Sequence, residues 1–257
     1  MRVTVCELDH DSGDFEKQWQ ALAAHTKARQ SDLVLLPEMI FAPWFAAEKN
    51  FDPLRWQQAV AQHDRWLQRL GELTPAVVLG TRPLTREDGL RLNQGFIVHP
   101  QDGYVAAHHK YYLPDEPGYW EASWYGRAGC DFTAREAGQV RIGMMICTDM
   151  WFNEHARAYG RQGAQLIAVP RATEKATFDK WLAGGRTAAI VSGCFCLSSN
   201  RADYTSRTAD LGGQGWIIDP DGKVLGITSA EQPFLTIDID PGHAVHARNS
   251  YPRYVRE

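Results

Sequence analysis

The sequence lacks the cysteine and histidine patterns that build disulfide frameworks or metal sites. It has five cysteines, an odd number, and no Cys-x-x-Cys pair, so neither a disulfide scaffold nor a zinc ribbon is expected. A His-Glu-x-x-His motif is missing, and Glu154-His155 stands alone. Walker A, Gly-x-Gly-x-x-Gly and Gly-x-Ser-x-Gly motifs are missing too. We therefore expect neither a metal nor an organic cofactor.

Long apolar runs and strong charge of one sign are also absent. No window approaches the ~20 apolar residues of a membrane-spanning helix. The first apolar run, Val3–Leu8, is interrupted by Glu7 and is too short for a signal peptide, so we expect a cytoplasmic protein without membrane contact. The formal net charge is -4 and no basic stripe occurs, so no nucleic-acid partner is expected.

The composition is that of a globular protein, with 44% hydrophobic and 23% charged residues over 257 positions. Apolar strand-like runs alternate with helical periodicities, and turn signals at 100–103 and 220–222 mark two hairpins. This pattern predicts an α/β protein with mixed sheets. A single domain is expected over residues 1–257, with a core to about 240 and a tail over 241–257.

The expected elements can be stated by residue number. Strands are predicted at 3–8, 32–36, 76–79, 96–99, 104–108, 140–147, 166–169, 194–198, 215–219, 223–226 and 234–239. Helices are predicted from 15 to beyond 23 and at 54–70, 153–162 and 178–191. Residues 113–133 contain prolines, glycines and many aromatics without a period, which indicates an ordered functional loop.

Cys147 ends a predicted buried strand and precedes Thr148-Asp149 and a predicted helix. A helix N-terminus would favour the thiolate and lower the cysteine pKa below the ~8.5 of a free thiol. Taken alone, Cys147 is explained at least as well as a small buried apolar residue.

Two charged residues also follow predicted strands. Glu38 comes directly after the run Leu33–Pro37, at an edge where α/β proteins place their sites and where burial would make it a usable base. Lys110 follows the first hairpin. Alone it is explained by a surface position, but a fixed cation could also stabilise an oxyanion.

The three positions together resemble the motifs of the nitrilase superfamily of carbon–nitrogen hydrolases. The matching segments are Leu35-Leu36-Pro37-Glu38, His109-Lys110 with Leu113-Pro114-Asp115, and Ile146-Cys147-Thr148-Asp149. Further counterparts run in order from about residue 1 to about 240. Within the superfamily the chain is most similar to N-carbamoylputrescine amidase-like and N-carbamoyl-amino-acid amidohydrolase-like members, because of the pattern over Asp115–Glu121 and the Trp151-Phe152 pair.

The resemblance implies a four-layer α-β-β-α sandwich with two mixed sheets and at least a homodimer. It implies Cys147 as nucleophile, Glu38 as general base, and Lys110 with the Thr148 N–H as oxyanion donors. Glu121 is expected to orient Lys110 or the substrate. The implied reaction is hydrolysis of a small amide or ureido compound through a thioester, with release of ammonia.

The motifs say less about which residues bind the substrate. Trp120 and Trp124 are expected to form an apolar wall. Arg171 departs from the small residue usual in the family and could receive a substrate carboxylate. The alternative for Arg171 is a salt bridge at the surface or a subunit interface, with Glu174 as candidate partner.

Rival functions remain at this stage. A nitrile substrate is disfavoured because Thr148-Asp149 replaces the Trp-Glu that usually follows the cysteine in true nitrilases. A papain-type pair of Cys147 with His108 or His109 has the wrong chain order. A non-catalytic ligand-binding protein of the same fold is the rival from another class, although all four motif residues are present.

Overall fold

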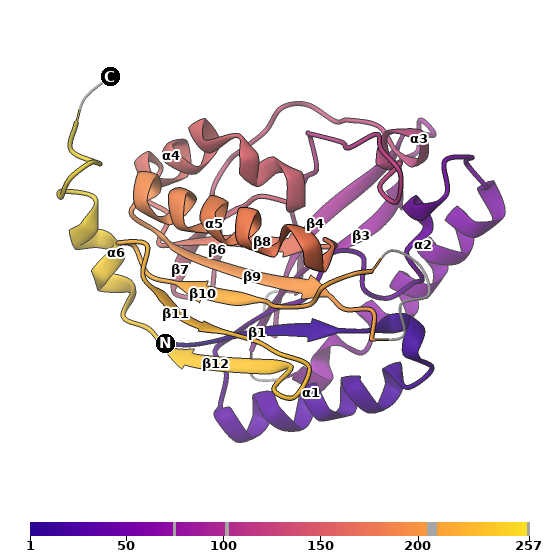
Figure 1. The fold of residues 1–257 in the computed structure, drawn as a ribbon, viewed down its shortest axis with the longest axis horizontal. Helices are drawn as coiled ribbons and strands as arrows, with labels where there is room; N and C mark the ends of the chain where they lie inside the picture. The colour runs from indigo at the N-terminus through magenta and orange to yellow at the C-terminus, as the bar shows by residue number, and fades with distance from the viewer. Residues whose placement is uncertain (74–75, 101–102, 205–209, 256–257) are drawn as a thin grey trace.

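The computed structural model describes residues 1–73, 76–100, 103–204 and 210–255 (Figure 1). The strands are β1 (Arg2–Leu8), β2 (Leu33–Leu35), β3 (Val77–Thr85), β4 (Arg91–His99), β5 (Gly103–His109), β6 (Arg135–Ala137), β7 (Val140–Met144), β8 (Leu166–Arg171), β9 (Phe195–Arg201), β10 (Trp216–Ile218), β11 (Val224–Ile227) and β12 (Phe234–Asp238). The helices are α1 (Phe15–Arg29), α2 (Pro53–Leu67), α3 (Glu121–Trp124), α4 (Asn153–Arg161), α5 (Phe178–Ser192) and α6 (Pro241–Ala247). Five short 3-10 turns are η1 (His10–Ser12), η2 (Phe45–Ala47), η3 (Leu70–Leu73), η4 (Cys147–Trp151) and η5 (Lys175–Thr177).

The strands form a mixed sheet, as predicted for the α/β class. Their main order is β5-β4-β3-β2-β1-β9-β8-β7-β6. The central neighbours from β3 to β7 are parallel, while β4, β5 and β6 join their neighbours antiparallel. The resemblance implied two separate sheets. Hydrogen bonds instead link all of these strands, because β1 pairs with β9 at Glu7↔Asn200 and Leu8↔Arg201.

Apolar side chains of β1 and β2 point alternately to the two faces of the sheet, and both faces are buried there. Val34 and Leu36 pack with Trp19 and Leu22 of α1. Residues of the opposite face, such as Leu35, share a core with strands of the other half. The shared core includes Val3, Val5, Leu33, Leu79, Ile142, Met144, Leu166 and Ala168. In Figure 1, α1 lies beside β12 and β1, whereas α4 and α5 lie over the other half.

Two differences from the predicted elements have local causes. β3 continues to Thr85 and pairs with β4 along Val78–Thr85, although Pro83 and the polar residues beside it hide this extension in the sequence. The tail forms α6, because Asp240 accepts a hydrogen bond from the Gly242 N–H at the helix N-terminus and Pro241 occupies the first turn. The centre of the predicted 100–103 turn, residues 101–102, lies outside the described residues.

Close contact between α4 and α5 depends on Gly160. A Cβ added there would lie 2.1 Å from the backbone carbonyl oxygen of Ser192, and backbone cannot move aside cheaply. We expect Gly160→Ala to lower the free energy of unfolding by about 2 kcal/mol or more, as overpacking does. Urea denaturation measures this. Gly71→Ala is the matched control, because nothing lies within 4 Å of the added Cβ. An equal effect of both substitutions would contradict the packing argument.

Candidate active site

Functional side chains converge where several strands end on one edge of the sheet. Glu38 follows β2, Lys110 follows β5 and Cys147 follows β7. Glu38 and Lys110 are fully buried and Cys147 is 3% exposed. The Glu38 backbone N–H donates to the Arg171 carbonyl at the end of β8 (3.2 Å), which ties the two halves of the sheet together beside the site.

Lys110 lies between two carboxylates. Its Nζ donates to Glu38 Oε1 at 2.8 Å and to both oxygens of Glu121 at 2.8 and 2.6 Å. Burial alone would lower the pKa of Lys110, but Glu121 and Glu38 raise it above its usual value. The lysine is therefore a permanent cation. The structure thus brings together the predicted Lys110, Glu38 and Glu121.

The two oxygens of Glu38 differ in their surroundings. Oε1 accepts from Lys110 and from Asn93 Nδ2 at 2.7 Å. Oε2 is buried and has no hydrogen-bond partner among the described residues. An unpaired carboxylate oxygen in a buried position is costly, and here it leaves one oxygen available to take a proton.

Glu121 lies at the start of α3 and is fully buried. The Tyr125 hydroxyl also donates to Glu121 Oε2. Burial raises the pKa of Glu121 to about 7; Lys110 opposes this rise and Glu38 adds to it. Two buried carboxylates facing one ammonium tend to retain a proton, because one cation cannot balance both charges.

Cys147 adopts a backbone φ of 49°, in the left-handed region that a residue with a side chain seldom occupies. Such a turn at the end of a strand is found where a side chain must project from the sheet edge. Burial raises the pKa of the thiol, while Lys110 and the Ala172 N–H lower it. The predicted stabilisation of the thiolate is therefore wrong. η4 is a single short turn rather than a helix, and burial outweighs its effect on the thiol pKa.

Asp149, two residues after the cysteine, is fully buried and anchors the site. Its carboxylate accepts four hydrogen bonds, from the backbone N–H groups of Tyr111 (3.1 Å), Tyr112 (3.0 Å) and Ile146 (3.0 Å) and from His108 Nε2 (2.9 Å). Asp149 therefore fixes the segment that follows Lys110 against the turn that carries Cys147. Asp149 lies within a motif that carries the resemblance, but no role was predicted for it, nor for Asn93 or Tyr125. Asn93 lies before the strand predicted at 96–99, and β4 also contains Arg91 and Gln94, so no pattern singled out Asn93.

A cavity of about 200 Å³ opens beside Cys147. Its lining residues are Pro114, Glu116, Tyr119, Glu121, Cys147, Thr148, Trp151, Ala172, Thr173, Glu174, Thr177, Lys180 and Trp181. Of the predicted substrate residues only Thr148 belongs to this lining. The cavity is smaller than the ~300 Å³ lower bound of common ligand pockets, which favours a small substrate.

Arg171 lies outside the cavity lining and is fully buried. Its guanidinium donates to Ser198 Oγ (2.7 Å), Thr173 Oγ1 (2.7 Å) and the Gln214 carbonyl (3.0 Å), and it stacks 3.9 Å from the centre of the Trp216 ring. None of these partners is Glu174, so the alternative prediction of a surface salt bridge with Glu174 does not hold either. Burial lowers the pKa of Arg171 to about 9. In this position Arg171 ties β8 to β9 and the chain before β10.

The two predicted wall tryptophans also lie outside the cavity lining. Trp124 is fully buried among aromatics and donates to the Glu48 carbonyl (2.6 Å). Trp120 stacks under the Lys49 ammonium at 4.5 Å. The apolar wall is formed instead by Trp151 and Trp181, whose ring centres are 4.7 Å apart. Trp151 directly follows the cysteine motif, so its position was readable from the sequence.

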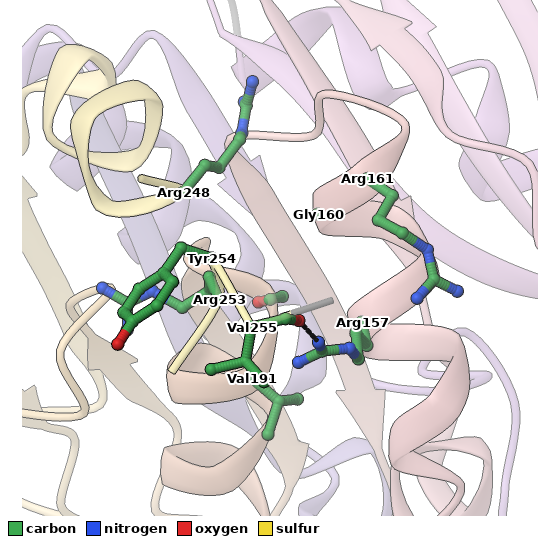
Figure 2. A pocket seen from close by; sticks show the side chains of 9 residues that line it. Arg157, Gly160, Arg161, Val191, Arg248, Arg253, Tyr254 and Val255 are labelled. Atoms are coloured by element: carbon green, nitrogen blue, oxygen red, sulfur yellow. Dashed lines mark hydrogen bonds between the residues drawn. The ribbon is translucent and has the colours of Figure 1, made fainter. Parts of the chain in front are cut away.

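A second cavity, of about 460 Å³, lies between α4, α5 and the C-terminal segment (Figure 2). Arg157, Arg161, Arg248 and Arg253 line it, and Arg157 donates to the Val255 carbonyl at 2.7 Å. Although larger, this cavity contains none of the groups around Cys147. Arg157 thereby holds the C-terminal segment against α4.

Two kinds of feature are absent from the described ranges. Within them, no three His, Cys, Asp or Glu side chains are grouped as a metal site would require. Likewise, none of the helices in the described part has the length and apolarity to span a bilayer.

Comparison with known proteins gives a family match over nearly the whole chain. The carbon–nitrogen hydrolase family model matches residues 2–249. A deaminated glutathione amidase from Synechocystis sp. is 27% identical over 201 residues, covering 74% of this chain and 73% of that protein. An N-carbamoylputrescine amidase from Arabidopsis thaliana is 24% identical over 169 residues, covering 63% of this chain and 55% of that protein. The crystal structure of a carbon–nitrogen hydrolase from Helicobacter pylori G27 matches with a TM-score of 0.86 at 18% identity, covering 99% of this chain and 94% of that one.

Proposed function

Because the chain belongs to the carbon–nitrogen hydrolase family, and is thus an enzyme that breaks carbon–nitrogen bonds, we propose that it hydrolyses a small amide or carbamoyl compound through a thioester on Cys147. The observation that carries this proposal is a buried carboxylate with one unpartnered oxygen in the same buried cluster as the Cys147 thiol. A thiol with a raised pKa needs a base, and Glu38 Oε2 is free to act as one.

In the first half of the reaction, Glu38 takes the proton from Cys147 as the sulfur attacks the carbonyl carbon. The carbon–sulfur bond forms and the carbonyl electrons move to oxygen. When the tetrahedral intermediate collapses, the carbon–nitrogen bond breaks and Glu38 returns the proton to the leaving ammonia or amine. A thioester on Cys147 remains.

The oxyanion is stabilised mainly by the Thr148 backbone N–H, with the Lys110 charge close by. The resting Lys110 directs its hydrogens to Glu38 and Glu121, so it contributes chiefly as a fixed positive charge. Preorganised charge of this kind needs no reorganisation during the reaction.

In the second half, water attacks the thioester and gives its proton to Glu38. The carbon–oxygen bond forms, the carbon–sulfur bond breaks, and the sulfur recovers a proton from Glu38. The acid leaves and the resting state returns. The same carboxylate thus acts twice as base and twice as acid.

The experiment that tests this function is ammonia release across ω-amides, carbamoyl amines, carbamoyl amino acids and nitriles. Turnover of amides or carbamoyl compounds, with little turnover of nitriles, is expected. Hydrolysis confined to nitriles would favour the nitrilase alternative. Absence of turnover throughout the panel would contradict the proposed substrate class.

The pH dependence should report the ionisation of Glu121. Burial raises the pKa of Glu121 to about 7, so its carboxylate forms only as pH rises through that value. We expect kcat/KM to increase between about pH 6 and 8, because the ionised Glu121 holds the Lys110 ammonium in place. Glu121→Gln removes the titrating carboxyl, so this limb should disappear while the maximal rate falls through misplacement of Lys110. An unchanged limb in Glu121→Gln would contradict this role of Glu121.

The four-layer α-β-β-α architecture and the single domain are part of the same proposal. One buried face of β1 and β2 packs on α1 and the other lies in the core shared with β7 and β8, and the family model spans most of the chain. Both observations support one domain with helices outside two facing halves of the sheet.

A further inference from the structure

His108, near the end of β5, has a buried imidazole that the proposed hydrolytic steps do not use. Its side chain is 1% exposed. Nδ1 lies 2.9 Å from the Asp131 carbonyl oxygen, and Nε2 lies 2.9 Å from Asp149 Oδ2. A carbonyl oxygen only accepts hydrogen bonds, so Nδ1 carries a proton. Whether Nε2 carries a second proton depends on the state of the Asp149 carboxyl.

The Asp149 carboxyl is surrounded by donors. Its Oδ1 accepts from the backbone N–H groups of Tyr111 and Tyr112, and its Oδ2 accepts from that of Ile146. Three fixed donors on two oxygens suit an ionised carboxylate, which has no proton of its own to place. The ionised form requires Nε2 of His108 to donate. The ring then carries protons on both nitrogens and one positive charge.

His63, the other histidine that is buried in the described part of the chain, has the opposite arrangement. Its Nδ1 lies 2.8 Å from the Ala59 carbonyl oxygen, whereas its Nε2 accepts from the Phe41 N–H at 3.4 Å. One nitrogen donates and the other accepts, as in a neutral imidazole. Burial accordingly lowers the pKa of His63 to about 3. The two buried histidines therefore differ in the partner that faces the second nitrogen.

A buried carboxylate such as Asp149 needs a counter-charge, because desolvation of an unbalanced charge is costly. Of the four groups that donate to Asp149, three are backbone N–H groups and only His108 can be a cation. Two further imidazoles, those of His109 and His155, interact electrostatically with His108, and burial lowers the pKa of both. The positive charge beside Asp149 therefore belongs on His108.

We propose that His108 is a buried imidazolium and a positioning residue, which holds the turn of Cys147 against the segment after Lys110 through its ion pair with Asp149. Asp149 accepts from the two residues that follow Lys110 and from the residue that precedes Cys147. A neutral ring would direct an Nε2 lone pair at the carboxylate, and their repulsion would loosen this junction. The charge of His108 stands on these contacts alone, whereas its effect on catalysis rests on the proposed function.

NMR of the ring nitrogens tests the charge in the wild-type protein with isotope-labelled histidine. At about pH 7.5 an exposed imidazole is mostly neutral, because its ordinary pKa is ~6.5. We expect one ring with two N–H protons that exchange slowly with solvent, which is His108. A second protected ring, that of His63, should carry a single N–H proton and serves as the internal control. Two neutral protected rings would overturn the proposal, whatever the activity of the enzyme.

Two substitutions separate the charge of His108 from its hydrogen bond. The longer amide in His108→Gln can donate to Asp149 from the position of Nε2, but without a charge. The shorter amide in His108→Asn takes the position of Nδ1 and leaves Asp149 without this donor. With butyramide as the probe substrate, we expect kcat/KM to fall about tenfold in His108→Gln and about a hundredfold in His108→Asn, as small misplacements of reacting groups cause. The loss should lie mainly in kcat, because His108 is not part of the cavity lining.

His243→Gln is the matched control for these variants. His243 forms the same type of pair with Asp221, at 3.1 Å, but its side chain is 40% exposed and lies outside the cavity lining. The substitution should leave kcat and KM for butyramide unaltered. A loss in His243→Gln equal to that in His108→Gln would show that the effect is not specific to the buried pair.

Alkylation by iodoacetamide gives a readout that needs no substrate. The rate at Cys147, relative to that at the exposed Cys130, should fall about tenfold in His108→Gln, because the groups around the thiol are displaced. If the wild type does not hydrolyse butyramide but the NMR and alkylation results are as expected, the proposed function fails for this amide and the role of His108 stands. Unchanged kcat and alkylation in folded His108 variants would overturn the positioning role. If neither variant folds, the NMR result on the wild type decides.

Discussion

Replacing Cys147 with alanine is expected to reduce turnover by at least roughly a thousand-fold, because the covalent route needs the thiol. The thioester cannot form without the sulfur, and the remaining groups only bind and polarise the substrate. Steady-state ammonia release measures the loss. Intact-mass analysis after rapid quenching should show an acyl adduct on the wild type and none on the variant.

The fold should survive this substitution. Cys147 is small and contacts a core that extends well beyond it, so the loss in unfolding free energy should stay near about 1 kcal/mol. Cys130, the exposed cysteine, supplies the control, since Cys130→Ala should retain wild-type turnover. Near-normal turnover of Cys147→Ala would rule out the thioester mechanism.

Replacing Glu38 with glutamine should cost roughly a hundred- to ten-thousand-fold in kcat/KM, the range of general-base catalysis. The amide keeps an oxygen to accept from Lys110 and Asn93, but it cannot take the proton of a thiol whose pKa burial has raised. The acylation step should therefore be slow, and rapid-quench mass analysis should find almost no acyl adduct accumulating.

The pH dependence of the Glu38→Gln variant provides a second readout. With no internal base, the reactive thiolate forms by loss of the proton to solvent, so residual activity should rise about tenfold per pH unit above neutrality. A merely structural role for Glu38 would lower the rate without this slope. Acylation of the variant at the wild-type rate would show that another group takes the proton.

The positions proposed as catalytic were accessible from the sequence because each follows a strand. Glu38 and Cys147 come after buried apolar segments, whereas Lys110 follows the half-exposed strand of a hairpin, and the motif order links the three. Strand positions were predictable for the same reason. The end of β3 was missed because its alternation continues through Pro83, where a turn is the usual expectation.

Side chains that act through tertiary contacts were less accessible. Arg171 follows a strand just as Glu38 does, but its guanidinium points to Ser198 and Gln214, and only the pairing of β8 with β9 decides that direction. Trp120 directly precedes Glu121 and Trp124 lies three residues after it, but the cavity is lined by Trp151 and Trp181 instead. Burial also reversed the expected pKa direction of Cys147, because desolvation depends on every element packed around the thiol.

The pairing of β1 with β9 affects the distance between Glu38 and Cys147. Along the order β2-β1-β9-β8-β7, four strand spacings separate the strand before Glu38 from the strand before Cys147, or roughly 19 Å in a flat sheet. The Glu38 N–H nevertheless donates to the Arg171 carbonyl at the end of β8, so the sheet must fold back on itself about this junction. Under the proposed mechanism, the distance that the proton travels from Cys147 to Glu38 then depends on how closely the two halves of the sheet pack. We therefore expect changes of side-chain volume at Leu79 or Ala168, which lie in the shared core, to alter the rate of proton transfer.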